Sequence, residues 1–185
     1  MKIALVSPYD YAHPGGVITH ISHLERHFIQ MGHEVKIIAP YSGDKASLGS
    51  DSIVASGRPF PVPASGSIAR ITLSPRLPSQ VRATLKREKF DIIHIHEPFT
   101  PLLPLTVLIL SESINVATFH ACHNTPRGYR FARPFLKGLF NKLDGKIAVS
   151  KPAMEFVARY LPGDYHVIPN GIDWEHFSAE VPPIE

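Results

Sequence analysis

Histidines are the residues of this chain whose types and spacing are best suited to chemistry. The chain contains eleven of them, and several fall close together. His94 and His96 are two residues apart in the apolar segment 91–96, so on a β-strand their side chains would share one face. Three further candidate ligands are expected near the same sheet edge: Glu97, His120 and His123. A metal site of the zinc-hydrolase kind is one interpretation. The other, which we favour because no carboxylate stands at ligand spacing, is that His94 packs in the core, His96 shapes a pocket and no metal binds.

His120 follows directly after the segment 115–119, at the end of a predicted strand. Its neutral imidazole can both donate and accept hydrogen bonds, which suits it to gripping a sugar hydroxyl or a phosphate. Cys122, the single cysteine, is interpreted as a packing residue. It would act as a nucleophile only if a neighbouring histidine base favoured its thiolate.

A second candidate for ligand binding is the pair Gly15 and Gly16, which separates the apolar segment 3–6 from a helical pattern ending at Gly32. Two glycines let the backbone approach a ligand closely, and the first N–H groups of a helix lack intrahelical partners. These donors and the helix dipole favour an anion such as a phosphate. Pro-Gly-Gly is also an ordinary turn, and the G-x-G-x-x-G fingerprint is absent, so this motif alone leaves both interpretations open.

These residues must be positioned by elements that alternate between strand and helix. The expected strands are 3–6, 34–39, 58–62, 67–73, 91–96, 115–119, 145–149 and 165–168, and the expected helices are 17–31, a short helix through 77–85, 102–108, 129–143 and 152–161. This alternation predicts an α/β, Rossmann-like, doubly wound fold with a mainly parallel sheet. In such sheets ligands bind beyond the carboxyl ends of the strands. The segments that fall there are 8–16, 96–98, 120–125, 150–151 and 170–171.

Bulk properties set broad limits. A chain of 185 residues is long enough for one well-buried domain, and its formal charge of +3 is far from a nucleic-acid-binding footprint. No apolar run approaches the ~20 residues of a membrane span. The start shows no secretory signal, and one cysteine fits a reducing compartment, so we expect a cytoplasmic protein.

Basic residues form stripes on two predicted helices. Arg82, Lys86 and Lys89 lie beside the apolar stripe of Leu77, Val81 and Leu85, and a second set repeats the arrangement on the helix 129–143: Arg130, Arg133 and Lys137. Such faces are usually solvated. Two of them together favour contact of one with anionic lipid headgroups.

Taken together, eight segments of the chain resemble a known family. They are Ser7-Pro8-Tyr9, Pro14-Gly15-Gly16-Val17, Gly32-His33-Glu34-Val35, 66–70 (Gly-Ser-Ile-Ala-Arg), 90–98 (Phe-Asp-Ile-Ile-His-Ile-His-Glu-Pro), Ala117-Thr118-Phe119-His120, 146–150 (Lys-Ile-Ala-Val-Ser) and 168–173 (Ile-Pro-Asn-Gly-Ile-Asp). The set resembles the amino-terminal half of retaining GT-B glycosyltransferases (glycosyltransferase group 1), most of all the phosphatidylinositol α-mannosyltransferases. The likeness runs from Met1 to about Phe177.

The resemblance implies an enzyme that transfers a hexose, mannose from GDP-mannose, to a lipid or glycan acceptor such as phosphatidylinositol at the cytoplasmic face of the membrane. It implies no cofactor and no required metal. Residues 1–169 would form the acceptor-binding domain, and 170–185 a hinge and tail towards a second, donor-binding domain without which this half is inactive. The roles implied are Gly15 and Gly16 on the donor diphosphate, His120 on the transferred sugar, Tyr9 and Arg70 at the acceptor, and Arg82, Lys86, Arg87 and Lys89 at the lipid surface. Where the family has an acceptor-binding lysine after His120 this chain has none, and Arg127 is the candidate substitute.

Two other functions stay open at this point. One is a phosphate-binding Rossmann-like module without catalysis, and the other is the metal-dependent hydrolase.

Overall fold

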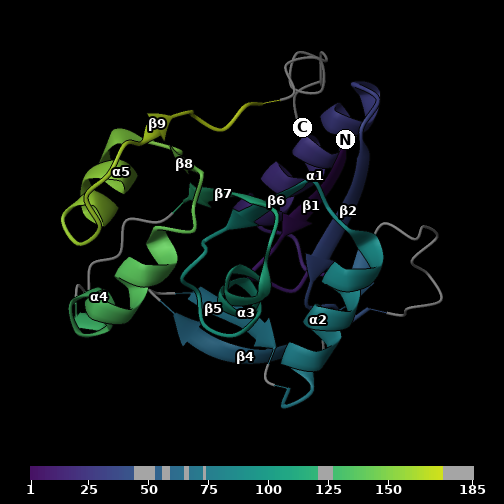
Figure 1. Ribbon diagram of the computed structural model, residues 1–185, viewed down its shortest axis with the longest axis horizontal. Helices are drawn as coiled ribbons and strands as arrows, with labels where there is room; N and C mark the ends of the chain where they lie inside the picture. The colour runs from purple at the N-terminus through teal and green to yellow at the C-terminus, as the bar shows by residue number, and fades with distance from the viewer. Residues whose placement is uncertain (44–52, 56–58, 65–66, 73, 121–126, 173–185) are drawn as a thin grey trace, which may run out of the picture.

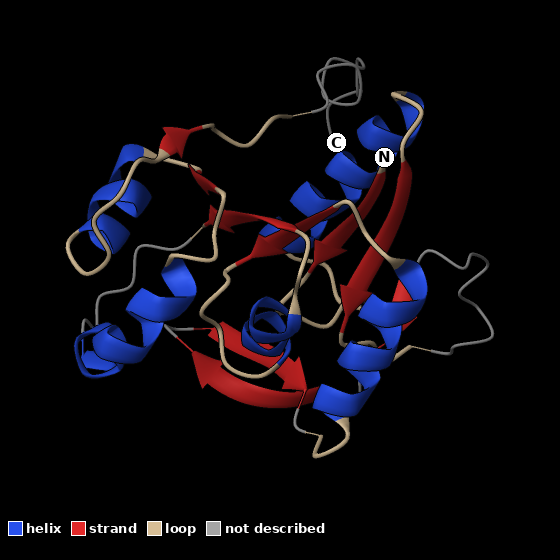
Figure 2. Cartoon of the chain, in the orientation of Figure 1, coloured by secondary structure: helices blue, strands red, loops and turns tan. Residues whose placement is uncertain are grey.

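The computed structural model describes residues 1–43, 53–55, 59–64, 67–72, 74–120 and 127–172 (Figure 1). Its strands are β1 (Lys2–Val6), β2 (Glu34–Ala39), β3 (Ile53–Ala55), β4 (Pro59–Ala64), β5 (Ser67–Thr72), β6 (Ile92–His96), β7 (Ile114–Phe119), β8 (Gly145–Ala148) and β9 (His166–Val167). Its helices are α1 (Gly16–Gln30), α2 (Leu77–Glu88), α3 (Leu103–Leu110), α4 (Arg127–Phe140) and α5 (Lys151–Ala158). Figure 2 shows strands and helices in separate colours.

A seven-stranded sheet in the order β3-β2-β1-β6-β7-β8-β9 forms the centre, and every pairing in it is parallel. Parallel strands need crossover connections, which here include α1, α2, α3, α4 and α5 (Figure 1). The strand order reverses between β1 and β6, which is the arrangement of a doubly wound fold. The predicted fold class is therefore confirmed.

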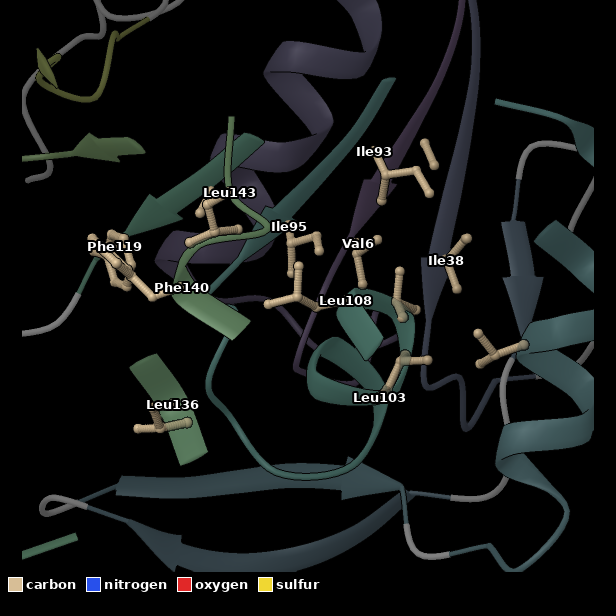
Figure 3. Packing of buried hydrophobic residues seen from close by; sticks show 14 of the residues in the cluster. Val6, Ile38, Ile93, Ile95, Leu103, Leu108, Phe119, Leu136, Phe140 and Leu143 are labelled. Atoms are coloured by element: carbon tan, nitrogen blue, oxygen red, sulfur yellow. The ribbon is translucent and has the colours of Figure 1, made fainter. Parts of the chain in front are cut away.

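Both faces of the sheet are buried, because alternate side chains along each strand meet helices on opposite sides. On one face Val6, Ile93 and Ile95 belong to a large core cluster that also contains Leu103 and Leu108 of α3 (Figure 3). The opposite face has a smaller cluster in which Ile21 of α1 packs with strand residues: Ile3, Leu5, Val35, Ile37 and Ala39. This second face carries the candidate site, since Leu5 is in register with His94.

A separate antiparallel hairpin, β4 and β5, lies apart from the large sheet (Figure 1). Pro59, Pro61 and Pro63 alternate along β4 while it keeps its pairing with β5. Proline has no N–H to donate, so alternation places all three at positions whose nitrogen faces the outer edge. The loop after β1 meets this hairpin through a backbone hydrogen bond, in which Asp10 N donates to Arg70 O at 3.0 Å.

The predicted elements are found with ends shifted by a few residues, and one strand was missed. β3 is three residues long and, among the described residues, pairs with β2 alone; it is too short to show an alternating pattern. On α4, Phe135 is 57% exposed, whereas Leu136 and Phe140 enter the core. Within the described segments, no helix is both long and apolar enough to span a bilayer.

Candidate functional site

The carboxyl ends of β1, β6 and β7 come together at one edge of the sheet. Val6 is in register with Ile95, and His96 with Thr118, so the residues that follow each strand are neighbours. α1 begins at this edge with Gly16, after the loop that leaves β1, and His120 directly follows β7. Gly16 and His120 therefore lie at the same end of the sheet, as their implied roles on one sugar diphosphate require.

Histidines from neighbouring strands stack along the α1 face. The His94 and His96 rings are stacked with centroids 4.5 Å apart, and His96 and His120 are stacked at 5.2 Å. His96 Nδ1 and His120 Nε2 share a hydrogen bond of 2.9 Å, and His94 Nε2 shares one of 2.7 Å with Thr118 Oγ1. The expected common face of His94 and His96 is confirmed, and His96 is fully buried.

A fourth ring closes the cluster from the helix side. His20 of α1 meets His96 edge-on with centroids 5.5 Å apart, and meets His120 in the same way at 5.2 Å. His20 lies one helical turn after Gly16, about 6 Å along the axis. The start of α1 and the imidazole of His120 are therefore connected through a single intervening side chain.

Burial keeps these imidazoles neutral. Desolvation, followed by the nearby imidazole of His20, lowers the pKa of His120 to about 4. Desolvation, with smaller contributions from His20 and His120, lowers the pKa of His94 to about 3, and burial holds the pKa of His96 well below its usual value. The pKa of His20 is lowered as well, again mainly by desolvation. At neutral pH each ring offers one N–H donor and one acceptor nitrogen, the state expected of His120 from the sequence.

Glu97 fixes the backbone on which His120 stands. Its carboxylate Oε1 accepts a hydrogen bond from His120 N at 2.6 Å, and its own N–H donates to Thr118 O at 2.9 Å. Glu97 is 5% exposed and adopts a left-handed backbone conformation with φ of 50°. Its charge also acts on Tyr9: desolvation first, and Glu97 second, raise the pKa of the Tyr9 phenol to about 12. Tyr9 thus remains a protonated hydrogen-bond donor close to the site.

The loop between β1 and α1 is ordered by a buried carboxylate. Asp10 accepts hydrogen bonds from Ser42 N at 2.9 Å, from Ala12 N at 3.2 Å and from His13 Nδ1 at 2.9 Å. Burial alone would raise the pKa of Asp10, but the hydrogen bonds from Ser42 and Ala12 bring it below its usual value. Through Asp10 N, which directly follows Tyr9, the loop is also tied to the backbone of Arg70.

The two glycines at the start of α1 have no internal structural requirement. Gly15 has extended φ and ψ of −179° and 155°, a conformation open to any residue, and Gly16 is the first residue of the helix. A Cβ at either position would meet no atom of the described residues within 4 Å. The first turn of α1 contains no acidic residue, and Gly15 has no side chain to cap it. The N–H groups at this end are therefore open to an external anion.

The basic residues of α2 lie on its solvent face, as predicted. Arg82, Lys86, Arg87 and Lys89 are all exposed. The end of α2 lies beside the start of β1, because Lys2 Nζ is 2.9 Å from the carboxylate of Glu88. The last turn of α2 is thus at the amino-terminal edge of the sheet, away from His120. The Arg87 guanidinium is also paired within the chain, with Nε 2.8 Å from Glu88 Oε1.

Several predicted residues lie outside what the structure describes. Cys122 and His123 fall in the segment 121–126, and the side chains of Arg127, Arg130 and Arg133 are outside the described set. Conversely, sequence analysis missed His20 and Asp10. His20 stands next to Ile21 in the apolar stripe of α1, one turn after Gly16, and this placement at the ligand-binding edge was the available signal.

Comparison with known proteins is consistent with this architecture. The family described as Glycosyltransferase Family 4 matches residues 14–176. The phosphatidyl-myo-inositol mannosyltransferase of Mycobacterium tuberculosis is 34% identical over 97% of this chain and 47% of its own length. The enzyme of the same name from Propionibacterium freudenreichii is 36% identical over 93% of this chain and 46% of its own. The chain thus spans about half the length of the curated relatives it matches.

Solved structures share the fold. A glycosyltransferase from Rickettsia africae has a TM-score of 0.63 at 15% identity, covering 96% of this chain and 45% of that one. Sucrose-phosphate synthase from Thermosynechococcus elongatus has a TM-score of 0.61 at 15% identity, covering 94% of this chain and 49% of that one. The fold is therefore a Rossmann-like domain of the GT-B glycosyltransferases, and the family match over most of its length shows that this chain belongs to glycosyltransferase family 4.

Proposed function

We propose that the protein containing this chain is a retaining hexosyltransferase that moves mannose from GDP-mannose to a lipid or glycan acceptor such as phosphatidylinositol. The reaction breaks the bond between the sugar and the nucleotide diphosphate, forms a bond from the same anomeric carbon to an acceptor hydroxyl oxygen, and passes the hydroxyl proton to the departing diphosphate. The observation that carries the proposal is the meeting, at one sheet edge, of an uncapped helix start at Gly16 with the neutral imidazole of His120. Relatives named for mannosyl transfer to phosphatidylinositol support the choice of substrates.

The donor is assigned to the start of α1. The N–H groups of the first turn and the dipole of the helix stabilise the negative charge of a diphosphate, and this charge increases as the sugar departs. Because neither Gly15 nor Gly16 carries a Cβ, phosphate oxygens can approach the backbone directly. His120 then contacts the transferred sugar with a ring that is bonded to His96 and stands on a backbone that Glu97 holds in place.

The acceptor is assigned to the loop after β1 and the adjoining hairpin. Tyr9 offers a protonated phenol, and Arg70, whose backbone is bonded to Asp10, offers a cation for an acceptor phosphate. Arg127 would be the second cation. In this scheme residues 1–169 form the acceptor-binding domain, 170–185 lead into a donor-binding domain, and the exposed basic face of α2 meets anionic lipid. The enzyme would work at the cytoplasmic face of the membrane without a required metal.

Replacement of His120 in the whole protein tests the assignment. With GDP-mannose and phosphatidylinositol-containing vesicles, His120→Ala should lower mannosyl transfer by at least about 100-fold, the range in which positioned catalytic groups act. His27→Ala, at an exposed position of α1 outside the cluster, is the matched control and should transfer at the wild-type rate. Wild-type transfer by His120→Ala would refute the role of the imidazole. Binding of nucleotide sugar with no transfer by the wild-type protein to any acceptor would instead favour a binding module without catalysis.

A further inference from the structure

Three imidazoles from separate elements converge at the site. One ring nitrogen from each of His20, His96 and His120 lies within 4.8 Å of the corresponding nitrogens of the other two. Among the residues that the structure describes, this is the only group of three or more histidine, cysteine or acidic side chains placed in this way. The three belong to α1, β6 and the residue after β7, so the spacing of residues in the sequence does not reveal the group.

The innermost ring is short of a partner. His96 is fully buried, and although its Nδ1 is bonded to His120, its Nε2 has no hydrogen-bond partner among the described residues. A buried polar atom is normally satisfied, so an unsatisfied one calls for an explanation. In the tautomer whose Nδ1 donates to His120 Nε2, the Nε2 of His96 carries a lone pair and is a free ligand atom.

We propose that His20, His96 and His120 form a binding site for a transition-metal ion of the Zn²⁺ class, with a solvent molecule as fourth ligand. Three histidines and an open position are an established ligand set for zinc, and imidazole favours Zn²⁺, Cu²⁺ and Ni²⁺ over Mg²⁺ or Ca²⁺. In a tetrahedral site with Zn–N bonds of 2.0–2.1 Å the ligand nitrogens are about 3.4 Å apart. The longest of the three separations must therefore shorten by up to about 1.4 Å. His96 is fixed by burial, whereas His20 and His120 are only partly buried and can supply the movement.

The ion is not one that turnover requires, and its expected effect is inhibition. A metal bound to His120 occupies the ring that, under the proposed function, contacts the transferred sugar. Donor sugar and metal should therefore compete for the same imidazole. This second step rests on the proposed function, whereas binding of the ion rests only on the geometry of the three rings.

Isothermal titration of the metal-free whole protein with ZnCl₂ tests the site, and titration with CoCl₂ adds a visible d–d absorption that reports coordination number. The wild-type protein should bind one Zn²⁺ with a dissociation constant in the micromolar range or below. His20→Ala and His120→Ala should each weaken this binding more than tenfold, since loss of even an outer-sphere partner of a metal ligand costs 10–100-fold. His27→Ala, two turns further along α1 on the same face as His20, should bind like wild type. Circular dichroism of each variant separates a lost ligand from a lost fold.

Two results would overturn the site: no stoichiometric binding by the wild-type protein, or binding that His20→Ala and His120→Ala leave unchanged. The activity arm distinguishes the two levels of the argument. Inhibition of mannosyl transfer by Zn²⁺, relieved by excess nucleotide sugar, supports both the site and the role of His120. Stoichiometric binding through His20 and His120 without any inhibition supports the site and contradicts the role of His120 in transfer.

Discussion

Replacement of Gly16 by alanine distinguishes the contribution of this position to the stability of the fold from its contribution to ligand binding at the start of α1. A Cβ at Gly16 meets no described atom within 4 Å, and Gly16 is already helical, so the added methyl group introduces no clash and no backbone strain. Alanine also reduces the conformational entropy of the unfolded chain, which stabilises a protein by about 0.4–1 kcal/mol at a compatible site. We therefore expect Gly16→Ala to raise the free energy of unfolding by up to about 1 kcal/mol.

The same substitution should impair binding of a donor diphosphate. The methyl group would stand where a phosphate oxygen approaches the N–H groups of the first turn. Loss of one hydrogen bond to a charged group costs about 1.5–3 kcal/mol, which corresponds to roughly a 10–150-fold weaker interaction. Nucleotide-sugar affinity and kcat/KM for transfer should fall by that factor in the whole protein.

Gly32 provides the matched control, because its backbone conformation favours glycine, whereas that of Gly16 accepts alanine. Its φ of +84° is in the left-handed region, where a side chain costs about 1–2 kcal/mol. Gly32→Ala should destabilise the protein by that amount in urea unfolding and leave kcat/KM unchanged at a temperature where the variant is folded. If Gly16→Ala bound donor and turned over like wild type, or if it were the less stable of the two variants, the reasoning about the helix start would be refuted.

Three further predictions follow from the same contacts. Because the pKa values of His94 and His96 are lowered in the folded state, the unfolded chain binds more protons than the folded chain below pH ~6.5. In urea unfolding, the free energy of unfolding should therefore fall by up to about 1.4 kcal/mol per pH unit for each of these histidines as the pH falls towards 4. A flat profile between pH 6.5 and 4.5 would contradict their neutral burial. Glu97→Ala removes the acceptor of the His120 backbone N–H, so it should lower the free energy of unfolding by about 1.5–3 kcal/mol and also lower transfer. Glu97→Gln keeps an acceptor oxygen and should cost less. Equal losses in the two variants would argue against this contact. Binding to anionic vesicles in a flotation assay should weaken as salt rises from 0.05 to 0.5 M, since salt screens the exposed basic residues on α2. Lys86→Glu should weaken this binding further. Salt-independent binding would exclude an electrostatic contact with lipid.

The fold was predictable from the sequence because most elements are long enough to show a period. The strand 91–96 and the helix after Gly16 carry clear apolar patterns, and the alternation of such segments determines a parallel sheet. β3 could not be predicted, since three residues paired along one side leave no periodic signal. On α4 residue type alone does not determine burial, because Phe135 is exposed whereas the neighbouring Leu136 and Phe140 occupy the inward face of that helix.

The site was predictable only in part, because some of its contacts join elements that are far apart in the sequence. The rule that ligands bind beyond the carboxyl ends of parallel strands located Gly16, Glu97 and His120 at one edge, and the strand period placed His94 and His96 on one face. It did not locate His20, which meets His120 only because α1 packs on the sheet in the folded protein. The buried hydrogen bonds of Asp10 were likewise invisible, because they join the loop after β1 to Ser42, thirty-two residues away.

The alternating prolines of β4 also affect how molecules of this protein behave towards one another. The edge strand of a two-stranded ribbon could pair with a strand from a neighbouring polypeptide and so start fibrillar assembly. Pro59, Pro61 and Pro63 remove backbone N–H groups from the outer edge of β4 at every second position, so an incoming strand would find hydrogen-bond acceptors but few donors there. The β4 edge of the ribbon therefore needs no other element to cover it in order to resist self-association.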